Sequence, residues 1–320
     1  MNGIFKEIRE SCRQVAENSR LVTIESGRLE DYVKSLPLDQ LNQLIMDDEN
    51  HFCGNEDLTV SYFFVLDCIN FGSGFFDHLI KTPGKSGYFT IASKLKDNFL
   101  ELGNFDCNYL QSLTAKDCSR IFAQQQADKT AQQLMQMFAT ALNELGKFVS
   151  AEFSGNFCKI LDTANHSAAK LIEILTRMPH YQDQSQYHGK TVLFLKRAQI
   201  TVSDLNIALN GKGRGYFSDI ADLTIFADNL VPHVLWIDGI LAYSPGLEAS
   251  IRNCELLEVG SDEEIELRAC AIHAVEMMRE EIARQGKELS SQQLDYLLWN
   301  QGQAKRYSAV SPHRTRTFFY

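Results

Sequence analysis

The amino-acid sequence predicts a mostly α-helical protein, and three observations support this prediction. Apolar residues recur three or four positions apart through most of the chain, as at Phe138, Leu142 and Leu145, and this spacing places them on one face of a helix. Ser261, followed three residues later by Glu264, has the pattern of a helix N-cap. Closely spaced glycines interrupt the central stretch of the chain, where they supply the permissive backbone that ends a helix.

The composition is that of an ordinary globular protein of one or two domains. Hydrophobic residues make up 44% of the 320 residues and charged residues 22%, and a chain of this length can bury roughly three quarters of its unfolded surface. No apolar run approaches the roughly 18 residues of a membrane span, and the first residues, MNGIFKEIRESCRQ, contain acids and no hydrophobic signal region. We therefore expect a cytoplasmic protein without a membrane partner.

The formal net charge of -10 argues against a nucleic acid as the partner. Binding of duplex DNA or tRNA depends on many Lys and Arg contacts to phosphate groups, and no run of basic residues here is longer than two. A single nucleotide or nucleoside needs far fewer cations. The charge balance therefore favours a small-molecule nucleotide as the partner.

The eight cysteines give no sign of a metal site or of a disulfide framework. None forms a Cys-x-x-Cys pair, and none stands at zinc-binding spacing from a histidine. We expect them to be reduced, partly buried small hydrophobic residues. The sequence thus predicts neither a bound metal nor another cofactor, and no catalytic cysteine is expected.

Helices are expected on both sides of a polar stretch at residues 179–190. The predicted helical ranges, from the spacing of apolar residues, are 1–47, 57–77, 84–123, 128–178, 191–241, 247–259, 261–285 and 290–302. Thr114 is the expected cap of a helix in the third range. Because Pro179 and Gly189 bound the polar stretch, we expect an N-terminal helical lobe at 1–178 and a C-terminal lobe at 190–320.

The stretch from residue 191 to residue 241 contains the acid of greatest chemical interest. It predicts a helix, a glycine turn, a short second helix, and a third helix that opens on Asp228. Asp228 stands among apolar residues, where it is either an N-cap or a catalytic carboxylate. Its surroundings make ionisation costly unless a cation lies near, and Lys196 on the preceding helix is the natural candidate. The alternative is a surface lysine without a functional role.

Several separated motifs resemble those of the queuosine salvage proteins, which hydrolyse queuosine 5'-phosphate. They run in the same order from roughly residue 57 to residue 320: LDCINF, SGYFTIASKL, LKRAQITVSDLNIAL, GKGRGYFSDIADLTIFAD, EIELRACAIHAVE, QLDYLLWNQGQ and HRTRTFFY. The helix, glycine turn and Asp-led helix also resemble the helix-hairpin-helix DNA glycosylases, in which an Asp beyond the hairpin faces the sugar. The resemblance implies a helix-hairpin-helix DNA-glycosylase-like fold with two lobes.

The resemblance to the salvage proteins implies an N-glycosidase that cleaves queuosine 5'-phosphate into queuine and ribose 5-phosphate, for queuine salvage into tRNA modification. Cleavage builds positive charge on the ribose, and we expect the Asp228 carboxylate to stabilise this charge or to activate the attacking water. Lys196 would pair with Asp228, neutralise the phosphate, or form an imine with the sugar. We expect the enzyme to act as a monomer.

Residues for binding the base follow from the same resemblance. The motif that contains Asn70 and Phe71 lines the nucleobase pocket in the salvage proteins. We expect Asn70 and Asp295 to contact the polar edge and the cyclopentenediol of the base, with Phe71 and Trp299 as stacking walls.

The chain departs from the family pattern in two places. The aromatic pair with Trp that usually follows Asn-Phe is replaced by Gly72-Ser73-Gly74, which precede Phe75 and Phe76. Either Phe75 or Phe76 then supplies the lost stacking face, or the enzyme selects a different base. The aromatic residue and Arg that commonly follow the acid are replaced by Asn229 and Leu230, so another cation is needed for the phosphate. The candidates for binding the phosphate are Lys196, Arg197, His51, His313 and Arg314.

Two other functions are considered. A non-catalytic module would bind a deazaguanine nucleoside tightly without releasing a product. A DNA-repair glycosylase of the same fold would bind duplex DNA with steep salt dependence, which the acidic charge disfavours.

Overall fold

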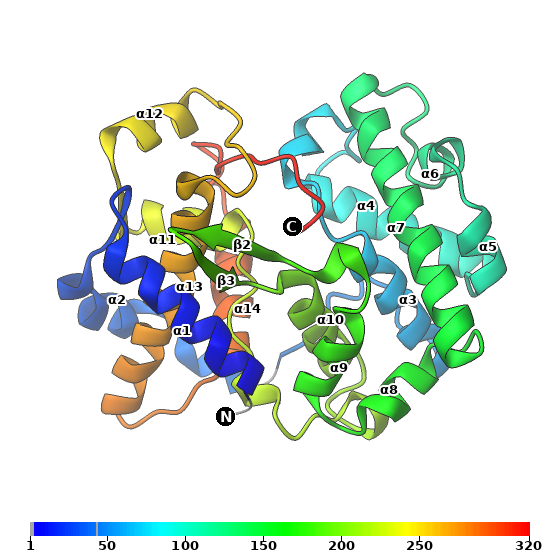
Figure 1. The fold of residues 1–320 in the computed structure, drawn as a ribbon, viewed down its shortest axis with the longest axis horizontal. Coiled ribbons are helices and arrows are strands. Elements are labelled where there is room, and N and C mark those ends of the chain that lie inside the picture. Colours follow the sequence, from blue (N-terminus) through cyan, green and yellow to red (C-terminus); the bar gives the residue numbers. More distant parts are fainter. Residues whose placement is uncertain (1–2, 43) are drawn as a thin grey trace.

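The computed structural model describes residues 3–42 and 44–320, and most of these residues are helical (Figure 1). The α-helices are α1 (Gly3–Asn18), α2 (Leu29–Ser35), α3 (Glu56–Cys68), α4 (Gly87–Leu102), α5 (Cys107–Ser112), α6 (Ala115–Ile121), α7 (Lys129–Phe153), α8 (Cys158–Ala164), α9 (Ala168–Leu175), α10 (Lys196–Ala208), α11 (Leu230–Ile237), α12 (Pro245–Arg252), α13 (Asp262–Arg284) and α14 (Ser291–Gly302). The 3-10 helices are η1 (Ser26–Arg28), η2 (Leu38–Asn42), η3 (Ser73–His78), η4 (Pro179–Tyr181), η5 (Gly213–Gly215) and η6 (Ile220–Asp222). The strands are β1 (Val22–Ile24), β2 (Gln184–Tyr187), β3 (Lys190–Leu193) and β4 (Leu241–Tyr243). The prediction of a mostly α-helical protein is confirmed.

The first helix packs with the C-terminal part of the chain. α1 buries one face, which includes Phe5 and Ile8, and lies against α13. β1 pairs with β4 in an antiparallel ladder that places Val22 opposite Tyr243. In Figure 1, α1 and α2 accordingly lie beside α11 and α13, whereas α3 to α8 form the other side of the molecule. This packing crosses the expected lobe boundary, because α1 covers apolar surface of α13.

α3 runs through the interior, and it ends earlier than the sequence predicted. Every residue from Thr59 to Cys68 is buried. Beyond Cys68, the backbone N–H of Gly72 donates to the carbonyl oxygen of Tyr320 at 2.9 Å, and not to the preceding helical turn. Asn70 and Phe71 therefore lie in non-helical chain between α3 and η3.

The prediction that residues 191–193 begin a helix is wrong. These residues belong to β3, which forms a hairpin with β2 and places Val192 opposite Ser185. The turn between the strands has positive φ at both His188 (47°) and Gly189 (79°), a geometry typical of tight β-hairpins. Pairing with β2 therefore overrides the helical spacing of the apolar residues, and α10 begins only at Lys196.

The predicted caps depend on local contacts, and the structure shows them. Thr114 and Asp117 form a reciprocal capping box at the start of α6. The Ser261 side chain accepts from the backbone N–H of Glu264 at 3.3 Å, but the Glu264 carboxylate bonds to Gly260 and Arg268. The second half of the expected capping box is therefore replaced by a tertiary contact.

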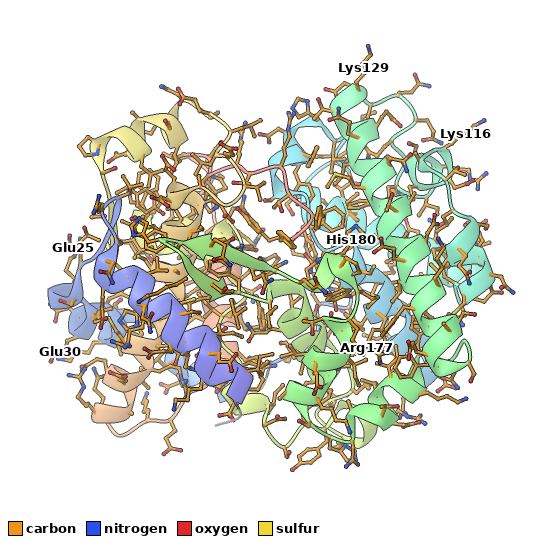
Figure 2. The ribbon with its side chains drawn as sticks, viewed as in Figure 1. Glu25, Glu30, Lys116, Lys129, Arg177 and His180 are labelled. Atoms are coloured by element: carbon orange, nitrogen blue, oxygen red, sulfur yellow. The ribbon has the colours of Figure 1, made fainter. Side chains whose placement is uncertain are left out.

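Charged side chains such as Lys116 and Lys129 point away from the body of the protein (Figure 2). Among the residues that the structure describes, no helix combines the length and apolar character needed to cross a bilayer.

Candidate active site

A cavity of about 440 Å³ lies between the segments around α3, α4, α10 and α14. Its wall combines aromatic, acidic and basic side chains from both ends of the chain. The residues that line it include Asn70, Phe71, Phe76, Tyr88, Phe89, Lys196, Asp204, Phe226, Asp228, Asp295, Trp299, Arg314 and Tyr320. Cavities of this size hold small-molecule ligands.

Asp228 lies at the N-terminal end of α11, half-buried in the cavity wall. Its Oδ1 accepts hydrogen bonds from the backbone N–H groups of Leu230 at 2.7 Å and Val231 at 3.4 Å. Within residues 3–42 and 44–320, Oδ2 receives no hydrogen bond. Asp228 therefore holds the start of the helix with one oxygen while the residue lines the cavity, so the two interpretations of this acid are compatible.

Lys196 is the first residue of α10, and its side chain is buried beside the cavity. Nζ donates to both the backbone oxygen and Oδ1 of Asn70, each at 3.1 Å. Burial lowers the pKa of Lys196, while the negative charges of Asp228 and Asp67 oppose this shift. No direct ion pair joins Lys196 and Asp228 in the described part of the chain, so they interact by charge through space.

Asp295 of α14 is a second acid next to Asp228. Its Oδ1 accepts from the backbone N–H of Phe226 at 2.8 Å. Burial raises the pKa of Asp295 to about 8, and the charge of Asp228 contributes to the rise. At neutral pH Asp295 is therefore mostly protonated and can donate a hydrogen bond to a ligand.

Asp67 of α3 and Asp204 of α10 form a further pair of carboxyl groups. Asp67 is fully buried, whereas Asp204 lines the cavity. Burial raises the pKa of both, that of Asp204 to about 7, and the charge of Asp204 contributes to the rise at Asp67. Two carboxylates this close do not both ionise readily, so the pair retains a proton near neutral pH. Asp67 also accepts from the Asn70 amide at 3.5 Å and so orients a side chain of the cavity wall.

Aromatic rings give the cavity flat walls. The Trp299 ring meets the rings of Tyr88 and Phe89 edge-on, with centroid distances of 5.7 and 5.5 Å. Phe71 meets Phe138 edge-on at 5.2 Å. Edge-to-face contacts of this kind fix ring orientations, so the aromatic side chains of the cavity wall are held in place.

Arg197, expected to bind a phosphate, lies behind the cavity wall. Its side chain is buried, and its guanidinium donates to the backbone carbonyl groups of Cys68 and His180. The same group lies 4.9 Å from the ring centroid of Phe71. Arg197 therefore supports an aromatic wall, and its hydrogen bonds are directed at backbone carbonyl groups and not at the cavity.

The two histidines expected near a phosphate are buried and neutral. His51 lines the cavity, but its Nε2 meets the Tyr88 hydroxyl at 2.9 Å, and burial lowers its pKa. Burial and the charge of Arg268 lower the pKa of His313 to about 3, and this side chain is not part of the described cavity wall. Arg314, which does line the cavity, is the better placed of the expected tail residues.

Sequence reasoning missed Tyr88, Asp204 and Tyr320 as cavity residues. Asp204 follows Lys196 by about two helical turns and so shares its face of α10, a signal that could have identified it. Tyr320 reaches the cavity through the docking of the C-terminal segment against Gly72. No local pattern predicts such a contact.

The cavity draws its residues from three separated parts of the chain, at 45–89, 196–230 and 292–320, and the family comparison spans nearly all of them. Residues 50–320 match the model of a family described as queuosine salvage protein. The chain belongs to the queuosine salvage protein family.

Several relatives that all carry the same protein name align with nearly the full length of this family member. The chain is 35% identical over 316 residues to the queuosine 5'-phosphate N-glycosylase/hydrolase of Sphaerobacter thermophilus, with 97% of this chain and 96% of the relative covered. Proteins of the same name from Bos taurus and Dictyostelium discoideum are 31% and 30% identical, with 100% and 98% of both chains covered.

The first departure from the expected family motif lies where the C-terminal segment of this queuosine salvage protein docks. A Cβ atom at Gly74 would stand 2.4 Å from the carbonyl oxygen of Thr315, and Gly72 adopts a φ of 100° that side-chain-bearing residues rarely adopt. The two glycines therefore permit the close approach of residues 315–320, which bring Tyr320 to the cavity.

The two phenylalanines after these glycines have different positions. Phe76 lines the cavity, whereas Phe75 is buried with the Arg316 guanidinium 5.3 Å from its ring centroid. Of the two replacements expected for the missing aromatic face, Phe76 is therefore the one that this family member places at the cavity.

The second departure, at Asn229 and Leu230, also meets the C-terminal segment. The Asn229 amide donates to the carbonyl oxygen of His313 at 3.3 Å, and Leu230 packs closely on Gly302 of α14. Arg314, the next residue after His313, lines the cavity. The queuosine salvage protein thus has a cation at the same cavity as the acid, even though none follows Asp228 in sequence.

Proposed function

We propose that this protein hydrolyses the N-glycosidic bond of queuosine 5'-phosphate and releases queuine and ribose 5-phosphate. The observation that carries the proposal is the convergence of Asp228, Lys196 and Asp295 on one aromatic-walled cavity. The end-to-end similarity to proteins named as queuosine 5'-phosphate N-glycosylase/hydrolase supports the same substrate.

Asp228 is proposed to act on the sugar. As the bond to the base breaks, positive charge develops on the ribose, and a fixed carboxylate next to C1' lowers the energy of this state. Oδ1 is held by the end of α11, so Oδ2 can face the sugar or accept a proton from the attacking water. A carboxylate held in place before the reaction needs no reorganisation during it.

Lys196 is proposed to place a positive charge beside Asp228. Its buried ammonium is anchored to Asn70 and interacts with Asp228 by charge. The same anchoring holds Asn70, whose side chain lines the cavity, in position to contact the base.

Asp295 is proposed to assist the departing base. A 7-deazaguanine has no N7 to protonate, so assistance must come through its pyrimidine edge or from the sugar. Because its pKa is raised to about 8, Asp295 is a proton donor at neutral pH beside the acid that acts on the sugar. Two carboxyl groups in different protonation states can then serve two roles.

The phosphate is proposed to bind Arg314 and Lys81. Both side chains line the cavity, and both contact the half-exposed carboxylate of Asp77, Lys81 at 3.5 Å. A substrate phosphate can compete with Asp77 for these cations, because charge-assisted hydrogen bonds to phosphate are strong.

The finer structural expectations stay part of this proposal. Positive φ angles at Gly211 and Gly213, between α10 and α11, suit a helix-hairpin-helix glycosylase-like arrangement with two lobes around the cavity. The protein is proposed to act as a monomer. All eight cysteines are free, which suits the reducing cytoplasm.

The test is to incubate the purified protein with queuosine 5'-phosphate, queuosine and GMP, and to measure released base by mass spectrometry. Release of queuine from the nucleotide is expected, with little or none from the other two. Tight binding of queuosine 5'-phosphate without release of queuine by the wild-type protein would instead identify a non-catalytic binding module.

A further inference from the structure

Arg268, in the middle of α13, contacts the segments that carry both Lys196 and Asp228. Its side chain is 1% exposed, and in the described part of the chain no residue of α13 lines the cavity. We propose that Arg268 is a positioning residue that fixes the separation of Lys196 and Asp228. This inference rests on the hydrolysis proposed above.

One contact of Arg268 holds the segment of Asp228. Nε donates to the carbonyl oxygen of Ala227 at 2.9 Å, and Ala227 directly precedes Asp228. On the other side, Leu230 donates its backbone N–H to the Asp228 carboxylate. Arg268 therefore holds the backbone just before Asp228, and the backbone N–H of Leu230 holds the Asp228 side chain.

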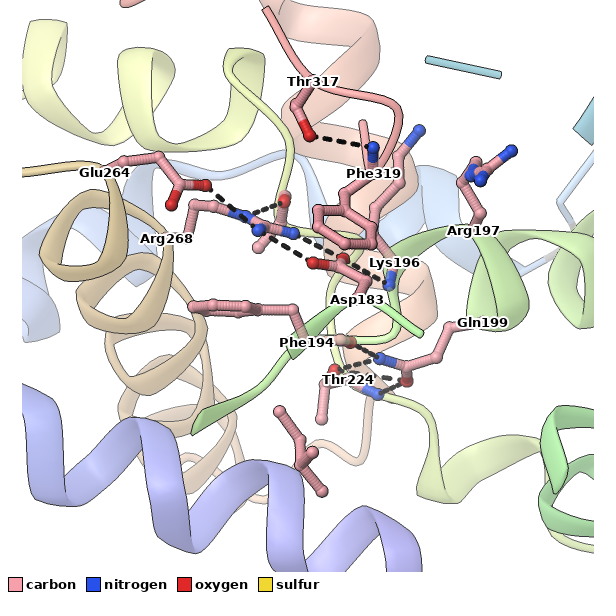
Figure 3. Close-up of polar contacts among 12 residues, drawn as sticks. Asp183, Phe194, Lys196, Arg197, Gln199, Thr224, Glu264, Arg268, Thr317 and Phe319 are labelled. Carbon is pink, nitrogen blue, oxygen red and sulfur yellow. Dashed lines mark hydrogen bonds and ion pairs between the residues drawn. The ribbon is translucent and has the colours of Figure 1, made fainter. Parts of the chain in front are cut away.

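The other contacts of Arg268 hold the segment of Lys196 through Asp183 (Figure 3). Two guanidinium nitrogens donate to the two carboxylate oxygens of Asp183 at 3.0 and 2.6 Å. Asp183 Oδ2 also accepts the backbone N–H of Lys196 at 3.0 Å. The Asp183 carbonyl oxygen accepts from Phe194 and Leu195, which holds Leu195 at a φ of 50°, an unusual value for leucine.

Arg268 has little freedom to move away from these partners. The ring centroids of Phe194 and Tyr320 lie 3.9 and 4.3 Å from the guanidinium carbon of Arg268. Glu264 accepts a further hydrogen bond from Arg268 at 3.1 Å. Burial alone would lower the pKa of Arg268, but the charges of Asp183 and Glu264 raise it. A charged, planar group with bidentate bonds holds its neighbours in one geometry.

A second pair of hydrogen bonds, made by Gln199 of α10, supports the same geometry. Gln199 donates to the Thr224 hydroxyl at 2.8 Å and accepts from the Thr224 backbone N–H at 2.9 Å (Figure 3). Thr224 precedes Asp228 by four residues, whereas Ala227 directly precedes it. The contact that sets the position of the Asp228 backbone itself is therefore the one made by Arg268.

The expected effect is on the rate of the chemical step. A misplacement of a reacting group by about 1 Å can lower a rate by about 100-fold. Lysine in place of Arg268 cannot bond to both Asp183 oxygens and Ala227 at once, because a single ammonium lacks the planar fork of donors.

The experiment compares Arg268→Lys and Asp183→Asn with the control Glu264→Gln, using queuosine 5'-phosphate and queuine release. Asp183→Asn and Glu264→Gln each remove one buried carboxylate charge next to Arg268. Of the two acids, Asp183 bonds to the Lys196 segment, whereas Glu264 bonds to Gly260 and Arg268. Each protein is assayed well below its measured unfolding temperature.

We expect Arg268→Lys and Asp183→Asn to lower kcat by about 100-fold with KM changed by less than about threefold, and Glu264→Gln to retain wild-type kcat. Equal losses of kcat in Asp183→Asn and Glu264→Gln, or wild-type kcat in folded Arg268→Lys, would overturn the inference. Failure of both Arg268→Lys and Asp183→Asn to fold would also overturn it, because the cluster would then serve folding. Absence of turnover by the wild-type protein would instead refute the proposed function.

Discussion

Replacing Asp295 with asparagine should remove a pH-dependent loss of stability. The wild-type carboxyl group is buried against the Phe226 backbone with its pKa raised to about 8 from an ordinary value of 3.8. Folding therefore favours the protonated form, and the stabilising effect of this proton is complete below the ordinary value. It is lost as the pH rises towards about 8. Asparagine has nearly the same shape and carries no titrating proton.

The magnitude follows from the two pKa values. Between them the folded state holds a proton that the unfolded state has released, so the free energy of unfolding falls by up to ~1.4 kcal/mol for each pH unit. From pH 5 to pH 7 this amounts to a loss of up to ~3 kcal/mol in the wild type that the Asp295→Asn variant does not share. Other titrating groups, including Asp204, are common to both proteins.

Urea unfolding of both proteins at pH 5, 6, 7 and 8 measures this difference. We expect the wild type to lose stability relative to the variant at each step. A difference between the two proteins that stays constant within ~0.5 kcal/mol across this range would refute the assigned burial and protonation of Asp295. The same proton is expected to be needed for turnover, so wild-type kcat should decline above about pH 8.

Further substitutions test the proposed roles in the cavity. Asp228→Asn should keep the fold, checked by circular dichroism, while kcat for queuine release falls by at least ~10³-fold; near-normal kcat would remove this acid from the mechanism. Phe76→Ala should raise KM by ~5- to 160-fold through lost stacking of ~1–3 kcal/mol, whereas Phe75→Ala should lower the unfolding temperature and leave KM unchanged. Equal effects of the two substitutions on KM would contradict the placement of these rings. Arg314→Gln should raise KM for queuosine 5'-phosphate by ~10- to 100-fold without weakening the binding of queuosine, measured by calorimetry, and a similar loss for both ligands would argue against a phosphate contact.

Local structure was predictable where the determining residues are close in sequence. The caps at Thr114 and Ser261 involve a side chain and a backbone N–H three residues apart, so their pattern is visible in the sequence. The apolar run of α3 likewise predicted a buried helix. Its early end after Cys68 was not predictable, since the bond between Gly72 and Tyr320 joins residues about 250 positions apart.

The residue types of the candidate site were predictable from the sequence, but how the residues come together around the cavity was not. Asp228, Lys196 and Asp295 were identified from residue type, setting and family resemblance, and the structure places them around one cavity. Arg197 has the same charge as Lys196 and is its neighbour in sequence, yet it lies behind the wall. On adjacent positions of a helix the two side chains point in different directions, and only the surrounding helices decide which direction is the cavity.

The sequence by itself determined the helical class, the caps at Thr114 and Ser261, the acidic net charge, and the family to which the chain belongs. These properties depend on composition, on spacing within a few residues, and on the order of short motifs. The tertiary structure decided that β3 is a strand, that α1 covers α13, that Phe76 and not Phe75 faces the cavity, and that Arg268 joins the segments of Lys196 and Asp228. Each of these depends on contacts between residues far apart in the chain, whose energy exists only once the packing has brought them together.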